Sequence, residues 1–408
     1  MKTHWFTLYT DTFFWLNDTF GLVYNTKNKK QFLFSLTNKL LDKSHQLLEI
    51  ENLYSIELTD NDISDNELNQ WIQSLINIEA GYLSHNVAFE KKPVSLKPIL
   101  KVQDKKEYYE LKHNQGKGSV ILQNLHELTF YINSSTNGNN EYYKQHLFPI
   151  KDCHVLDSSQ IFSFIRNSRN PFLCNINIVG NIFSYPNFEK FLIDISTFSI
   201  PCTTHIMIND LLDNKEKINE INFIDHIHFN FLIESAFDVS SLKDISFPYS
   251  ITAFIVSESD FIKFSSLLES FSSTQLIKMI PIYNGENMRF FKSNVFIDKD
   301  EIEHIALSKN EIFMRQSINI GNYGKLIIMP NGNVYDNVNV SPMGTINNSP
   351  YSLVYKEFIE NKSWFRTRDQ SPCKDCIYQW LCPSPSNYEI VMGRNNLCNI
   401  NLNNNISE

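Results

Sequence analysis

Four cysteines near the C-terminus have the residue type and the spacing of a metal site. The segment follows the pattern Cys373-x2-Cys376-x5-Cys382-x15-Cys398, so three of the chain's 7 cysteines fall within ten residues. A CxxC pair can place two thiolates on one metal within a tight turn, and Pro372 favours such a turn over a helix. Four soft thiolates without a histidine suit either a 4Fe–4S cluster or a Zn²⁺ ion, and spacing alone does not separate the two.

The composition is that of an ordinary globular chain of 408 residues, 42% hydrophobic and 20% charged. Its formal net charge of −9 and the absence of a Lys/Arg block argue against a nucleic-acid partner. The sequence contains no apolar run of about 18 residues, so no membrane-spanning helix is expected. Residues 1–9 lack a signal-peptide pattern. We therefore expect a cytoplasmic protein, in which clustered reduced cysteines indicate metal ligation. Asparagine is frequent, which we attribute partly to codon bias rather than to function.

Residues 1–88 are predicted to form a small winged-helix-like module. Three short aromatic and β-branched runs, separated by Asn/Asp clusters typical of hairpin turns, are 10–16, 20–25 and 31–35. Leucines at helical spacing follow over 36–48. The stretch Ser64-Asp65-Asn66-Glu67 is predicted to be the capped start of a second helix, 65–78, that carries Trp71.

Residues 119–324 are predicted to form a parallel α/β sheet, joined to the first module by an exposed polar connector, 89–118, with room for one added strand. Strand-like and helix-like runs alternate, which is typical of right-handed crossovers. The predicted strands are 128–132, 174–179, 204–208, 226–231, 251–256 and 276–282. The predicted helices are 159–166, 188–196, 217–223 and 261–270. Six units favour a partial (β/α) barrel, with an open doubly wound sheet as the alternative.

The C-terminal part, 325–408, resembles the SPASM domain, an extension found in many radical S-adenosylmethionine peptide-modifying enzymes. The likeness is carried by a hairpin over 330–335, the segment 343–346, the cysteine stretch 373–389 and the closing residues 396–398. It implies an iron–sulfur cluster on the four cysteines. It also implies that the alternating segment upstream is a radical-SAM-like barrel.

Departures from the family pattern imply that this barrel is degenerate. A full SPASM domain holds two clusters, but Asp336, Asn337 and Ser386 stand here where first-cluster ligands would be. Radical enzymes carry Cys-x3-Cys-x2-Cys after the first barrel strand, and here no cysteine follows that strand until Cys153. The family's GGEP segment is replaced by 179–183. We expect one cluster at most and no S-adenosylmethionine chemistry.

This pattern resembles the pseudo-radical-SAM/SPASM proteins of ribosomal peptide maturation systems in Bacteroidetes-like bacteria. The resemblance implies a non-catalytic accessory protein that binds a precursor peptide, a radical SAM maturase, or both. In such systems a leader peptide adds as a strand to the wing of a small module. Here 30–34 is the candidate edge, and helix 65–78 would offer the pocket. The alternatives are an active iron–sulfur peptide-modifying enzyme using the remaining cluster, and a zinc-stabilised interaction protein outside peptide maturation.

Two further groups contain reactive residue types. His226 and His228 share one face of a predicted strand, but no third metal ligand is near them in sequence, so a structural or barrel-mouth role is expected. Asp152, Cys153 and His154 contain the parts of a nucleophilic cysteine site. Adjacent side chains diverge, however, and rarely form a productive nucleophile–base pair.

Overall fold

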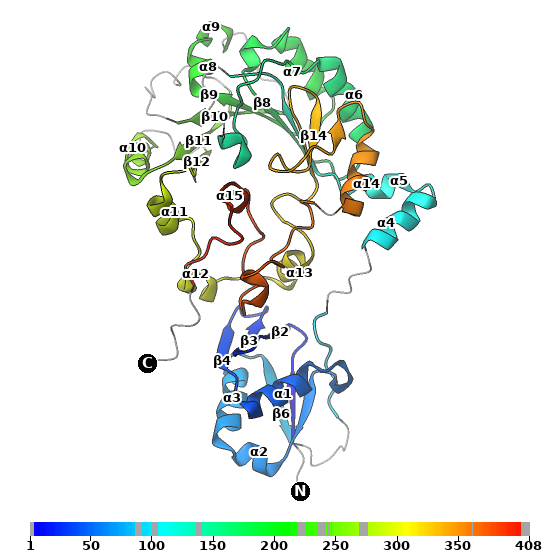
Figure 1. The fold of residues 1–408 in the computed structure, drawn as a ribbon, viewed down its shortest axis with the longest axis vertical. Helices are drawn as coiled ribbons and strands as arrows, with labels where there is room; N and C mark the ends of the chain where they lie inside the picture. The colour runs from blue at the N-terminus through cyan, green and yellow to red at the C-terminus, as the bar shows by residue number, and fades with distance from the viewer. Residues whose placement is uncertain are drawn as a thin grey trace.

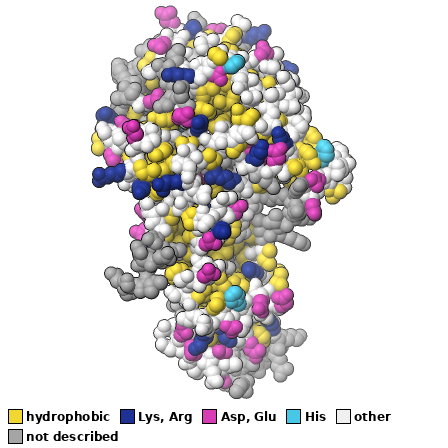
Figure 2. Space-filling model, in the orientation of Figure 1, with side chains coloured by type: hydrophobic (Ala, Val, Ile, Leu, Met, Phe, Trp, Pro, Cys, Tyr) yellow, Lys and Arg dark blue, Asp and Glu magenta, His cyan; other side chains and the backbone are white. Residues whose placement is uncertain are grey.

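The computed structural model describes residues 4–85, 92–99, 105–135, 141–218, 226–234, 242, 245, 247–268, 276–360 and 362–400. The fold is mixed α/β, with one large mixed sheet. Figure 1 shows the N-terminal module at one end of the long axis, the large sheet at the other, and the cysteine-rich tail between them. In Figure 2 the N-terminal module is the narrower part of the surface. Within the described ranges, no helix is long and apolar enough to cross a membrane.

The N-terminal module contains two antiparallel three-stranded sheets. The first follows the three predicted runs: β2 (Thr12–Leu16), β3 (Phe20–Asn25) and β4 (Gln31–Ser35). The second, in the order β5-β1-β6, was not predicted: β1 (His4–Leu8), β5 (Ser55–Leu58) and β6 (Gly81–His85). The helices are α1 (Asn38–Leu48), α2 (Asp60–Ser64) and α3 (Asn66–Asn77). Within the predicted capped start 64–67, Asp65 is the residue that caps α3, and it accepts from the Leu68 N–H at 3.0 Å. The module therefore has twice the strands of the predicted wing.

The β2–β3–β4 sheet is buried on both faces, because its apolar side chains alternate between two cores. On one face Phe34 packs edge-on against Trp71 of α3, with ring centroids 5.7 Å apart. On the other face Phe13 meets Phe313 at 5.4 Å, and the Tyr24 hydroxyl accepts from the Leu307 N–H at 2.7 Å. This second core also contains Ile377 and Leu381, so the sheet joins the N-terminal module both to residues 302–313 and to the cysteine-rich tail.

The large sheet has nine strands in the order β12-β11-β10-β9-β8-β7-β13-β14-β15. The six predicted strands are parallel to one another: β7 (Glu127–Tyr131), β8 (Asn175–Val179), β9 (Cys202–Met207), β10 (Ile227–Ile233), β11 (Tyr249–Ile255) and β12 (Leu276–Pro281). These strands are neighbours in sequence order, as in a partial barrel, whereas a doubly wound sheet reverses its order.

The predicted tail hairpin extends the same sheet. Its strands are β13 (Lys325–Ile328), β14 (Asn333–Tyr335) and β15 (Gly344–Thr345). β13 pairs parallel with β7 and antiparallel with β14, and Gly332 makes the turn with a φ of 81°. The sheet therefore continues across residues 324 and 325, where the sequence predicts a domain boundary. The division of the chain into these domains stays a prediction.

The helices of the barrel and tail are α4 (Lys105–Asn114), α5 (Gly118–Leu122), α6 (Ser158–Ser168), α7 (Phe188–Ser196), α8 (Ile208–Leu212), α9 (Lys215–Ile218), α10 (Glu258–Leu268), α11 (Met288–Asn294), α12 (Lys299–Glu303), α13 (Lys309–Ser317), α14 (Pro350–Glu360) and α15 (Asn387–Val391). Helices α6 and α7 cover the outer face of the sheet and share its largest apolar core. The described part of the connector contains α4 and no added strand. The predicted helix 217–223 lies mostly outside the described residues.

Candidate metal centre

The structure brings the four predicted cysteines together around one cavity of about 300 Å³. Cys373 and Cys376 lie on a tight turn, where the Cys376 N–H donates to the Cys373 carbonyl at 3.1 Å. Cys382 follows a second turn. Cys398 lies near the end of the described tail, and a short parallel bridge to Ile297 positions it beside the other three cysteines. Each of the four thiols is partly buried and free of disulfides.

The four thiols form a donor set that fits a metal centre without selecting the metal. Four soft thiolates without a histidine suit either a 4Fe–4S cluster or a Zn²⁺ ion. All four line the same cavity, and Arg368 lines it with them.

Burial and nearby charge act in opposite directions on these thiols. Burial raises the pKa of Cys376 and Cys398, and it raises the pKa of Cys382 to about 12. The Arg368 guanidinium, itself buried, partly offsets this effect on all three. Metal ligation must displace the thiol protons, so the site favours the apo thiol form until a metal arrives.

The positions expected for a second cluster are filled by other side chains. Asn337 donates to the Asn387 side-chain oxygen at 2.7 Å, which joins the two segments that would have carried those cysteines. Asp336 lies buried against Glu357 of α14, and the contact of two carboxyl groups requires one of them to keep its proton. Burial first, and then the charge of Asp336, raise the pKa of Glu357 to about 8.

The Glu357→Gln variant is expected to be more stable than the parent chain at alkaline pH. A carboxyl whose pKa is raised on folding stabilises the fold below its ordinary pKa, and that contribution is lost as pH rises through the folded value. The advantage of the variant should therefore grow between about pH 4.5 and 8, by about 1.4 kcal/mol for each unit of raised pKa. Urea unfolding at pH 5, 7 and 9 measures it. A difference that does not change with pH would contradict the raised pKa.

The carboxyl ends of the barrel strands are covered by the chain's own residues 142–150. Phe148 packs there against Leu232 and Phe254, which lie one residue before the ends of β10 and β11. Gln145 accepts from the Tyr283 N–H at 2.9 Å and donates to the Tyr283 carbonyl at 2.7 Å. Barrel enzymes place their active sites at this end of the strands. Gln145 and His146 of this segment also line a cavity of about 440 Å³, together with Thr129 and Asn177 of the sheet.

The tail helps to hold this segment in place. The His146 ring hydrogen-bonds to the hydroxyl of Tyr388 on α15, and the two rings meet at 5.1 Å. Tyr388 also donates to the Pro281 carbonyl at the end of β12. Burial lowers the pKa of His146 to about 4, so its ring is neutral near pH 7. The cysteine-rich tail and the barrel therefore share one packed interface.

A hydrogen-bonded row of polar side chains crosses the inner face nearer the amino ends of the strands. In order, it contains His228, Ser250, Asn230, His205, Asn177 and Thr129. His205 Nδ1 accepts from the Asn230 amide at 3.0 Å, and its Nε2 donates to the Asn177 oxygen at 3.1 Å. Both bonds fit a neutral ring, and burial lowers the pKa of His205 to about 3. His228 therefore has a structural partner and lies at the amino end of β10, away from the mouth.

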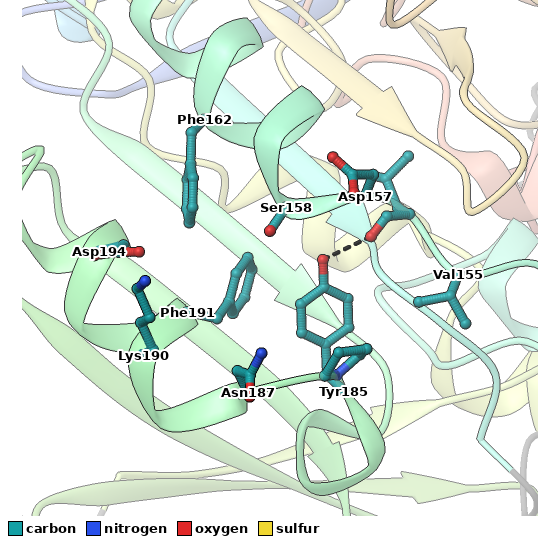
Figure 3. Close-up of a pocket in the computed structure, with 11 residues that line it drawn as sticks. Val155, Asp157, Ser158, Phe162, Tyr185, Asn187, Lys190, Phe191 and Asp194 are labelled. Atoms are coloured by element: carbon teal, nitrogen blue, oxygen red, sulfur yellow. Dashed lines mark hydrogen bonds between the residues drawn. The ribbon is translucent and has the colours of Figure 1, made fainter.

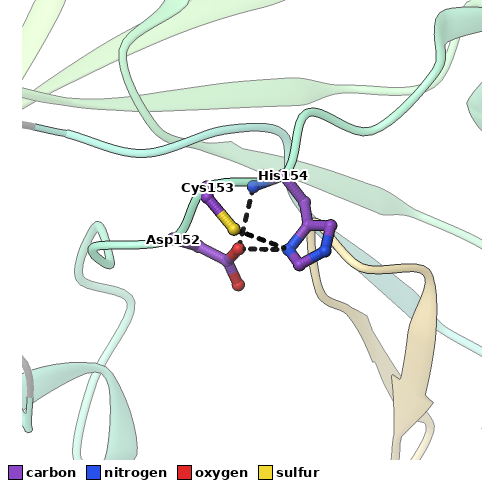
Figure 4. A group of neighbouring side chains, drawn as sticks. All are labelled: Asp152, Cys153 and His154. Carbon is purple, nitrogen blue, oxygen red and sulfur yellow. Dashed lines mark hydrogen bonds and ion pairs between the residues drawn. The ribbon is translucent and has the colours of Figure 1, made fainter.

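Asp152, Cys153 and His154 come together on one loop, as Figure 4 shows. The Cys153 Sγ lies 3.6 Å and the Asp152 Oδ1 lies 2.6 Å from His154 Nδ1. A nucleophile–base–acid relay needs the nucleophile and the acid on opposite ring nitrogens. Because both contact the same nitrogen, Asp152 cannot orient the ring while the other ring nitrogen accepts the thiol proton.

A groove of about 320 Å³ between α6 and α7 also lacks the parts of a reactive site. Figure 3 shows Tyr185 in it, with its hydroxyl donating to the Leu156 carbonyl at 2.6 Å. Burial raises the pKa of this phenol, so it stays neutral. Lys190 and Asp194 line the rim, and the groove lies on the outer face of the barrel, away from the cysteines.

No family model matches the chain, and no curated protein matches it. Two similar solved structures are of SuiB from Streptococcus suis. SuiB bound to precursor peptide SuiA is 12% identical, covering 97% of this chain and 99% of that chain, with a TM-score of 0.48. SuiB bound to S-adenosylmethionine is 11% identical, covering 97% and 100%, with a TM-score of 0.48. At this level of similarity, neither the fold family nor the function of this chain follows from these structures.

Proposed function

We propose that this chain is a non-catalytic accessory protein of ribosomal peptide maturation, with a radical-SAM-like barrel and a SPASM-like tail. The tail carries one 4Fe–4S cluster on Cys373, Cys376, Cys382 and Cys398, with Zn²⁺ as the alternative metal. One observation carries the proposal: the four thiols share a cavity, while residues 142–150 cover the end of the barrel where catalysis would occur. When bound, such a cluster supplies one-electron transfer and cross-links the tail.

The proposed peptide partner is a precursor peptide that pairs with the free edge of β4. Two hydrogen bonds flank the β3–β4 pairing: the Leu36 N–H donates to the Thr19 carbonyl, and the Lys30 carbonyl accepts from the Asn25 N–H. In an antiparallel pair, every second residue of a strand directs its N–H and C=O toward the partner strand, so Lys30, Leu36 and the even-numbered residues between them face β3. The peptide groups of Leu33 and Ser35 therefore point away from β3. Among the described strands, β3 is the one neighbour of β4. An extended peptide could add there through backbone hydrogen bonds.

The structure corrects two details of the predicted peptide site. Trp71 of α3, expected to line a pocket for the peptide, is 3% exposed because Phe34 covers it. The start of β4 is also tied down, since the Gln31 amide donates to the carbonyls of Ile302 and Glu303 at 3.1 and 2.6 Å. Recognition would therefore rest on the backbone near Ser35 rather than on a pocket in α3.

The full chain is expected to bind the precursor peptide encoded beside its gene, and Ser35→Pro is expected to weaken that binding at least about tenfold, or 1.4 kcal/mol. Proline removes the outward N–H of an exposed edge residue while leaving the β3–β4 pairing intact. Ser35→Ala keeps the N–H and is the matched control. Calorimetric titration of the three proteins measures the effect.

Equal affinity in Ser35→Pro and Ser35→Ala would exclude strand addition at this edge. Undetectable binding by the folded parent chain would contradict peptide recognition by β4. That result would favour the other proposed partner, a radical SAM maturase.

A further inference from the structure

Arg368 is a buried cation in contact with the candidate metal centre. Its side chain is 8% exposed, and its Nη1 lies 3.6 Å from the Cys373 Sγ and 2.9 Å from the Glu389 Oε1. Its Nε donates to the Pro383 carbonyl at 2.5 Å. Three acceptors therefore hold the guanidinium, so its orientation toward the sulfur is fixed by the fold.

Glu389 is the matching buried anion. It is 1% exposed, forms the ion pair with Arg368, and also accepts from the Ser386 hydroxyl at 3.2 Å at the start of α15. The two opposite charges are thus held together beside Cys373, and the Arg368 Nη1 contacts both the Glu389 carboxylate and the Cys373 sulfur. Since both are shielded from water, their fields are screened less than those of surface charges.

The reduction potential of an iron–sulfur cluster depends on the charge around it and on hydrogen bonds to its sulfur ligands. Reduction adds an electron to a site that already carries four thiolates. An N–H donor and a positive charge at Cys373 stabilise the reduced state, whereas a nearby carboxylate destabilises it. The two residues therefore shift the reduction potential of the cluster in opposite directions.

We propose that Arg368 and Glu389 set the reduction potential of the tail cluster, with Arg368 raising it through Cys373 and Glu389 lowering it. This inference rests on the proposed cluster. A purely structural pair, which only fastens α15 to the cysteine loop, is the competing explanation. In that case loss of either partner would break the same contact and disturb the site in the same way.

The test is a redox titration of the reconstituted full chain, followed by absorption and electron paramagnetic resonance. Arg368→Gln is expected to shift the midpoint potential to more negative values, and Glu389→Gln is expected to shift it to more positive values. Arg368→Lys keeps the charge and should restore most of the shift seen in Arg368→Gln. Arg166→Gln, which changes an exposed arginine on α6, should leave the potential unchanged.

Shifts of the same sign in Arg368→Gln and Glu389→Gln, or no shift in either, would overturn the inference while leaving the cluster in place. A parent chain that holds no cluster would overturn the proposed centre and the inference with it. If Arg368→Gln loses the cluster, the sign of the Glu389→Gln shift and the potential of Arg368→Lys still decide the question.

Discussion

Cys382→Ala is expected to abolish metal binding and to destabilise the tail by about 3 kcal/mol or more. Cys382 is one of the four proposed ligands and lies on a loop built of tight turns, and metal ligation is coupled to folding at such sites. The loop also packs against Phe13, Leu22 and Tyr24 of the N-terminal sheet. Metal analysis and thermal unfolding of parent and variant measure the two effects.

Cys174→Ala is the matched control, because Cys174 is exposed and directly precedes β8, outside the metal site. It should keep the parent's metal content and unfolding midpoint. Full metal content in Cys382→Ala would remove this residue from the ligand set. A loss of metal without any loss of stability would contradict the coupling between the site and the tail fold.

The second large effect is an expected absence of radical chemistry. Under strong reductant, the reconstituted chain should form no 5′-deoxyadenosine from S-adenosylmethionine above a control without protein. The residues after β7 are tied to the fold: the Asn133 amide donates to the Asn181 carbonyl at 2.8 Å, and the Ser135 hydroxyl donates to Asp210 at 2.7 Å. No cysteine follows β7 before Cys153, whose side chain contacts His154.

The assay requires an active radical enzyme run in parallel as a positive control. The Cys382→Ala variant should give the same background as the parent chain. Product formation by the parent that disappears in Cys382→Ala would contradict the accessory role and favour the active iron–sulfur enzyme.

The barrel strands were predictable because each is a local apolar run bounded by polar turns. All six appear within a few residues of their predicted limits. The second N-terminal sheet was not predictable in this way, since β1 pairs with β5 and β6, which lie roughly 50 to 80 residues further along the chain. Short strands of this kind are defined by long-range pairing rather than by local periodicity.

That the four cysteines line one cavity was predictable from their spacing, but the residues around them were not. Arg368 and Glu389 are separate charged residues in sequence, and folding makes them a buried ion pair beside Cys373. The row through Asn177 and Asn230 was missed for a different reason. Asparagine is poorly suited to strands and frequent in this chain, so its occurrence there carried no visible signal.

The most direct test of the central claim is the iron and acid-labile sulfide content of the anaerobically reconstituted full chain. One 4Fe–4S cluster predicts about four iron and four sulfide per chain, with absorption at about 400 nm. One zinc per chain without iron would contradict the cluster, and about eight iron per chain would contradict the single centre.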